Sequence, residues 1–226
     1  MSLLDWFKRN PIRFTRFDDA FALTRTALWK LLRQTVESPR HSAKTIWLVV
    51  HFTDTFAELQ SQLDQWQLDY EIVTCPIDPN QLERSGLLAP SQIQVVLAEM
   101  IPADMTTMLE PSLDHTIAMI VVERHPNVRF DLQLETFARS LPRKVEFGHY
   151  LALEDEVVKT TINETSIKLL RQLGMSEHEL ITSNMVTRRL DKVLARAAES
   201  YRTNHPADSA KQWLELNGSL TRTDAN

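Results

Sequence analysis

The chain has 226 residues, of which 43% are hydrophobic, and its formal net charge is −5. This apolar content is enough for one substantial core with an appended piece. The negative charge gives no whole-molecule reason to expect nucleic-acid binding. The single cysteine, Cys75, excludes an intramolecular disulfide and a cysteine-rich metal site, and it fits a reducing compartment.

The first 40 residues are basic, with eight Lys and Arg against four Asp and Glu, a difference of +4. Apolar and cationic side chains stand together at the start: Leu3, Leu4, Trp6, Phe7, Lys8 and Arg9. This pattern predicts peripheral contact with an anionic membrane or an acidic partner. A flap folded onto the core is the alternative. The sequence has no apolar run long enough to span a membrane and no secretory signal, so we expect a cytoplasmic location.

Residues 17–36 predict one amphipathic helix within an N-terminal segment at 1–40. Its apolar stripe consists of Phe17, Phe21, Leu28, Trp29 and Leu32. The stripe predicts either a docking face for a partner or packing against the chain's own domain.

Five apolar runs with strand character follow, and helical spacing occurs between some of them. The runs are residues 45–52, 70–75, 93–100, 116–123 and 145–153; the helical stretches are 54–67, with Thr53 or Asp54 as its cap, and 129–140. The alternation predicts an α/β domain over residues 41–155, with a doubly wound, mainly parallel sheet of about five strands. Cys75 ends the second run and is predicted to be a buried structural thiol.

After Leu153 the pattern becomes helical, which predicts a C-terminal extension over residues 156–226. Helices are expected at 161–173, ended by Gly174, at about 183–201 with Ser183 or Asn184 as cap, and at about 207–216. The polar tail is expected to fray.

Several groups of residues carry a family resemblance. They are Glu123-Arg124-His125 with Arg129, Asp131, Gln133 and Leu134; Tyr150-Leu151 with Leu153-Glu154-Asp155; Leu173-Gly174-Met175; and Val186-Thr187-Arg188. In type and spacing they resemble SecA, the ATP-driven motor of bacterial protein export. The resemblance covers roughly residues 44–200. It implies a RecA-like fold, the second motor domain of that family, followed by the start of its helical scaffold.

The chemistry that the resemblance implies is incomplete here. The chain has four glycines, and none lies in the G-x-x-x-x-G-K-[ST] context of a phosphate-binding loop. Phe137 and Ser140 stand where the family has its two finger arginines, and Arg139 lies one position before Ser140. The sequence therefore predicts a degenerate motor domain that is not an enzyme and needs no cofactor.

Five polar residues are candidates for a residual nucleotide or anion cleft: Arg124, His125, Arg129, Asp131 and Gln133. The alternative is structural, with hydrogen bonds and an Arg–Asp pair holding the turn from strand to helix. The histidines lack ligand spacing, so no metal site is expected. Glu154, Asp155 and Glu156 are expected at a strand end entering a helix, where acidic side chains favour the helix dipole.

These patterns predict a catalytically inactive, SecA-like binding or regulatory module. Its partner is expected to be a protein, such as a component of the translocation machinery, and not a nucleic acid. Two alternatives stay open: a half-motor completed in trans by a separate ATPase subunit, and an orphan domain with a new small-ligand site in the old cleft.

Overall fold

The computed structural model describes residues 14–38, 40–41, 44–78, 81–82, 85–90, 92–102, 116–162, 165, 168, 172 and 180–218. The segment predicted to contact a membrane or partner, with Leu3, Leu4, Trp6, Phe7, Lys8 and Arg9, lies outside these residues. So do Gly174 and much of the helix predicted at 161–173.

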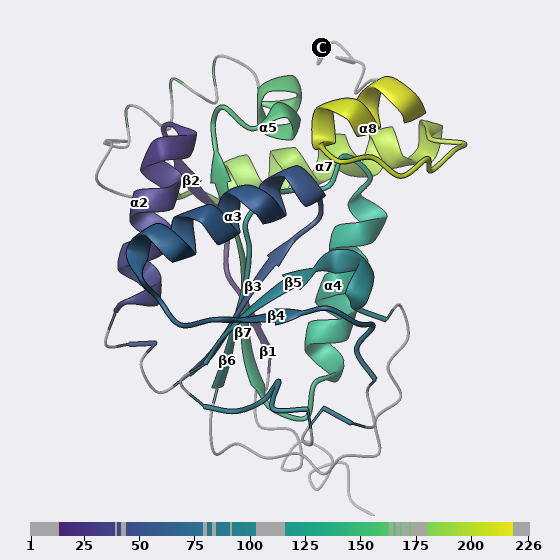
Figure 1. Ribbon diagram of the computed structural model, residues 1–226. Helices are drawn as coiled ribbons and strands as arrows, with labels where there is room; N and C mark the ends of the chain where they lie inside the picture. Colours follow the sequence, from purple (N-terminus) through teal and green to yellow (C-terminus); the bar gives the residue numbers. More distant parts are fainter. Residues whose placement is uncertain are drawn as a thin grey trace, which may run out of the picture.

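An eight-stranded, mostly parallel sheet forms the centre of the molecule (Figure 1). The strands run in the order β4-β5-β3-β6-β7-β2-β8, and β1 also pairs with β7. Only the β2–β8 pair is antiparallel among the described strands. Their bounds are β1 Phe14–Arg16, β2 Ala20–Ala22, β3 Thr45–Val50, β4 Glu71–Val73, β5 Ile93–Leu97, β6 Thr116–Val121, β7 Lys144–Ala152 and β8 Ile181–Thr182.

The predicted α/β class is confirmed, and the five predicted runs correspond to β3 through β7. The sheet is wider than predicted because β1, β2 and β8 add short strands beyond or along β7. The described helices are α2 Arg25–Val36, α3 Thr53–Trp66, α4 Val128–Ser140, α5 Glu156–Thr161, α7 Asn184–Ser200 and α8 Ala210–Asn217, with a 3₁₀ turn η1 at Ala98–Met100.

Helices cover both faces of the sheet because the central strands are apolar on both sides. On β3, Trp47 and Val49 belong to the core on the α4 side, where Trp47 packs on Phe137 with ring centroids 5.7 Å apart. Ile46 and Leu48 belong to the core beneath α2 and α3. The alternation of successive side chains along a strand produces these two layers.

The helix predicted over 17–36 is wrong at its beginning. It starts at Arg25, with Thr24 as N-cap accepting from the Ala27 N–H, and the chain before it is extended as β1 and β2 along β7. Phe21 is fully buried in β2, whereas Phe17 between the strands is 50% exposed. Apolar residues spaced three or four apart do not by themselves separate a helix from short extended pieces.

The prediction for Cys75 is also wrong, because its thiol is exposed. Cys75 follows β4, the outermost strand on its side of the sheet, where Glu71 and Ile72 are exposed as well. A short edge strand has no neighbour to cover its outer side, so hydrophobic composition overestimates its burial.

The C-terminal helices cover one end of the sheet. A third core joins residues from α5, α7 and α8 to the strand region, including Phe21, Leu151, Leu190 and Trp213. These helices lie across the top of the sheet in Figure 1. Among the described residues, no helix is both long and apolar enough to cross a membrane.

Candidate functional site

The carboxyl ends of β3 and β6 mark the place where an open α/β sheet ordinarily binds a ligand. The two strands are neighbours, and the helices that follow them, α3 and α4, cover opposite faces. Such a change of direction leaves a crevice at the strand ends. His51 follows β3 here, and Glu123, Arg124 and His125 follow β6.

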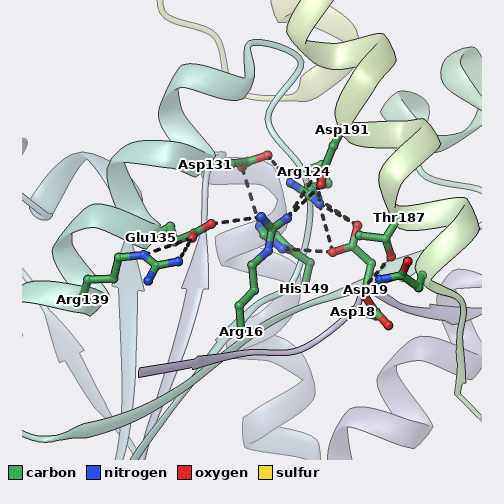
Figure 2. A network of polar contacts seen from close by, with 11 residues as sticks. Arg16, Asp18, Asp19, Arg124, Asp131, Glu135, Arg139, His149, Thr187 and Asp191 are labelled. Carbon is green, nitrogen blue, oxygen red and sulfur yellow. Dashed lines mark hydrogen bonds and ion pairs between the residues drawn. The ribbon is translucent and has the colours of Figure 1, made fainter. Parts of the chain in front are cut away.

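Arg124 fills this place with an internal ion network (Figure 2). Its guanidinium is 2% exposed and donates to Asp19 at 2.7 Å, to Asp131 at 3.1 Å and to Asp191 at 2.8 Å. The three carboxylates come from the β1–β2 connection, the first turn of α4 and the middle of α7. Arg124 therefore joins the N-terminal strands, the sheet and the C-terminal helices.

Two buried histidines complete the network. His51 Nε2 lies 2.8 Å from Asp131 Oδ1, and His149 Nδ1 lies 3.3 Å from Asp19 Oδ1. The second contact does not meet hydrogen-bond geometry, so His149 is an electrostatic neighbour of Asp19 rather than a well-aligned donor.

Charge pairing within the network sets its protonation. Burial alone would raise the pKa of Asp19, but the Arg124 charge and the contact with His149 outweigh it and lower this pKa to about 2. Burial is likewise opposed at Asp131, where the hydrogen bond with His51 and the Arg124 charge hold the pKa below its usual value. Burial, assisted by Arg124, lowers the pKa of His149. Both carboxyls are thus ionised and committed to partners inside the protein.

The network continues to the surface through Arg16 on β1. Arg16 bridges Glu135 of α4 and Asp191 of α7, each at 3.1 Å. Arg139 pairs with Glu135 at 2.5 Å and lies over the Phe14 ring, 4.0 Å from its centroid.

The five predicted cleft residues are not all brought together. Arg124 and Asp131 form the buried pair, as in the structural interpretation of the sequence. His125 is buried among aromatic rings, stacking on Phe52 at 5.2 Å, and burial lowers its pKa to about 3. Arg129 is exposed on α4, and Gln133 donates to the Ile101 carbonyl at 3.2 Å.

Glu123 occupies the N-terminus of α3, a position that favours anions. Its carboxylate accepts from the backbone N–H groups of His51 at 2.8 Å and Phe52 at 3.1 Å, and from the Thr55 hydroxyl at 2.8 Å. The predicted caps, Thr53 or Asp54, are wrong: the N-cap residue is Phe52, whose side chain makes no capping bond. Burial raises the pKa of Glu123. The chain's own carboxylate thus takes the place of an external anion.

Beside Glu123 lies a cavity of about 240 Å³ whose charged lining residues are mostly acidic. Five of its residues are acidic and three basic: Glu58, Glu123, Glu154, Asp155 and Glu156 against Arg25, Arg124 and Lys211. The excess of acidic over basic side chains in this lining would disfavour a polyanionic phosphate chain.

Arg25, at the start of α2, organises the wall of that cavity. Its guanidinium contacts Asp155 at 3.0 Å, Glu58 at 3.3 Å and the Val122 carbonyl at 3.4 Å, and its backbone N–H donates to Glu154 at 2.8 Å. Burial raises the pKa of Asp155 to about 6 despite the Arg25 charge. Glu154 and Asp155 lie where β7 leads into α5, as predicted, and act there as structural groups.

Phe137 and Ser140, where the resemblance leads one to expect arginines, differ in exposure: Phe137 is buried and Ser140 is half-buried. Phe137 is 1% exposed against Trp47, and the Ser140 hydroxyl donates to the Phe137 carbonyl at 2.7 Å. Within the described ranges, no three His, Cys, Asp or Glu side chains are grouped to hold a metal ion.

The sequence interpretation missed Asp19, His51, His149 and Asp191. His51 carried a usable signal, because a polar residue directly after a buried parallel strand lies at the ligand-binding edge. Asp19 and Asp191 stand 105 and 67 residues from Arg124, and no spacing rule connects them.

Comparison with known proteins gives one partial similarity. The chain is 29% identical over 106 residues to the protein translocase subunit SecA of Amoebophilus asiaticus (strain 5a2), which covers 47% of this chain. It spans 9% of that relative's length. No protein-family model matches the chain. The similarity and the mostly parallel α/β sheet together are consistent with a SecA-like, RecA-like domain.

Proposed function

We propose that this chain is a catalytically inactive, SecA-like domain that acts in the cytoplasm as a binding module on a protein partner in translocation. The partial similarity to a translocase subunit supports the process. At the ligand edge of the sheet, Glu123 and Arg124 are bonded to other groups of the chain. This supports the proposal that the chain does not hydrolyse ATP.

The observation that carries this proposal is the position of Glu123 at the α3 N-terminus. Phosphate chemistry requires donors directed at the phosphates, a metal-binding carboxylate and an arginine at the transferred group. Here the two backbone donors that immediately precede α3, the N–H groups of His51 and Phe52, are already bonded to Glu123. Arg124 is bonded to three aspartates. Neither group is available to a nucleotide without breaking a buried contact.

The test is phosphate release from ATP with magnesium by the wild-type protein and by Ser140→Arg. We expect both to equal a buffer blank, because an arginine adds charge to a site that holds no phosphates. Phe137→Arg is a poor variant, since removing a buried phenylalanine costs about 3–5 kcal/mol. Reproducible turnover by the wild-type protein would overturn the proposal.

The same assay with purified motor subunits tests the first alternative, and a ligand titration of the isolated chain tests the second. Turnover that exceeds the sum of the separate proteins would indicate a half-motor completed in trans. Saturable binding of a small molecule without turnover would indicate a new ligand site in the old cleft.

A further inference from the structure

The outward face of α7 carries a row of cations. Arg188, Lys192 and Arg196 are exposed and stand four residues apart, so their side chains follow one another along the helix. Like charges at this spacing destabilise a helix. Within the part of the chain that the structure describes, none of the three forms an ion pair. The arrangement gives no evident stability gain, which directs attention to a binding role.

The two acidic residues of α7 offset only a part of the charge of this row. Asp191 turns inward to Arg16 and Arg124, as Figure 2 shows, whereas Glu199 stands three residues after Arg196 on the same side of the helix and offsets only the last cation of the row. The molecule as a whole is negative, at −5. The row is therefore a local positive surface on an acidic protein.

A cavity of about 170 Å³ lies beside the row, between α4 and α7. Val128, Leu132 and Ala195 form its apolar part, and the Leu132 side chain is 51% exposed at its rim. The rest of its lining belongs to the ion network: Arg16, Arg124, Asp131, Glu135, His149 and Asp191. Ala195 and Arg188 are seven residues apart, hence on nearly the same side of α7.

We propose that this α4–α7 face binds an acidic protein segment, which lays its carboxylates along Arg188, Lys192 and Arg196 and places one apolar side chain beside Leu132. The inference rests on the proposed binding function and names the chemistry of the partner. A nucleic acid fits less well, because the net charge is negative and the row contains no aromatic side chain for base stacking. A membrane fits less well, because the apolar element is a hollow rather than a protruding anchor.

The probe is a fluorescent 12-residue peptide of Asp and Glu with one central Leu, measured by anisotropy against the full chain. Its counterpart replaces Asp and Glu by Asn and Gln. The test variant combines Arg188→Glu, Lys192→Glu and Arg196→Glu. The control combines Lys30→Glu, Arg33→Glu and Lys159→Glu, which are exposed cations on α2 and α5 and give the same change in net charge.

We expect the acidic peptide to bind and the amide counterpart not to bind. The test variant should weaken binding at least tenfold at low salt, and the control no more than threefold. Added salt should weaken wild-type binding, since the Debye length falls from about 30 Å at 0.01 M to about 8 Å at 0.15 M. Leu132→Ser should remove the preference for the Leu peptide over a Gly version.

Three results would overturn the inference: equal affinity for the acidic and amide peptides, equal loss in the two triple variants, or binding confined to phosphatidylglycerol vesicles or single-stranded DNA. Thermal unfolding of each variant shows whether it is folded. The assay contains no nucleotide, so its failure is distinct from failure of the proposed function. ATP turnover would contradict the proposed function but not the binding of an acidic segment.

Discussion

Arg124 joins three aspartates from separate parts of the chain. Because the arginine is buried, the stability of the fold depends on whether its charge stays paired. Removing the arginine leaves Asp19 and Asp131 as buried charges without their main counter-ion. Breaking one partner out of a buried ion pair is far more costly than replacing the whole pair. A neighbouring arginine, Arg129, is exposed and provides a control on the same segment.

Arg124→Met should therefore lower the free energy of unfolding by about 3–5 kcal/mol, and Arg129→Met by less than about 0.5 kcal/mol. Urea unfolding followed by circular dichroism measures both. Equal effects of the two substitutions would mean that the network does not stabilise the fold.

Asp155 gives a prediction for pH. Its folded pKa is raised to about 6 from 3.8, so the folded state holds more protons than the unfolded state between these values. Its contribution to stability is fully present below about pH 4 and is lost as pH rises through 6. Asp19 acts oppositely: its pKa is lowered to about 2, and its contribution is lost as pH falls below 4.

The difference in unfolding free energy between the wild-type protein and Asp155→Asn should consequently shift in favour of the variant as pH rises from 4 to 6. Urea titrations at half-unit intervals measure it. A difference that stays constant across this range would show that Asp155 titrates normally.

At the scale of elements, the central strands were predictable and the peripheral ones were not. The runs that form β3 and β6 are nearly continuous in apolar residues, since both faces are covered. β1, β2 and β8 have two or three residues each. These segments are strands because they pair with strands that are distant in the sequence. The local sequence pattern does not predict such pairing.

The candidate site likewise has one part that the sequence predicted and one that it did not. Arg124 and Asp131 are seven residues apart, and the turn between them suggested their pairing. The rest of the network is brought together by the sheet order, which places Asp19 on the β7 side, and by α7 folding back with Asp191. These contacts depend on tertiary structure and were outside the reach of spacing arguments.

The basic N-terminal segment still carries a testable prediction, although it lies outside the described residues. Because Phe14–Arg16 form β1 and Arg16 holds two ion pairs, a truncation should remove residues 1–13 and leave these in place. The truncated protein should bind anionic vesicles or an acidic partner more weakly than the full chain at low salt. Equal co-sedimentation of the two proteins would exclude this role.

At the scale of the whole molecule, the C-terminal helices belong to the fold. Trp213 on α8 is 2% exposed and packs edge-on against His125 with centroids 5.0 Å apart. Leu190 and Leu194 on α7 are fully buried in the same core as Phe21 and Leu151. A chain without α7 and α8 would expose that core and would lose Asp191 from Arg124.

Truncation after residue 162 should therefore give an unfolded or aggregating protein, and Trp213→Ala should cost about 3–5 kcal/mol. Circular dichroism and gel filtration of the truncated chain test this. A monomeric, cooperatively unfolding product would show that the sheet domain folds independently of the helices.

We infer that the chain's own side chains fill the ligand edge of this sheet. Calorimetric titration of the full chain with magnesium and ATP tests it most directly. We expect no saturable heat up to millimolar nucleotide, because Glu123 occupies the α3 N-terminus and Arg124 is bonded to its aspartates. Saturable one-to-one binding in the micromolar range, weakened by Lys211→Glu in the adjoining cavity, would contradict it.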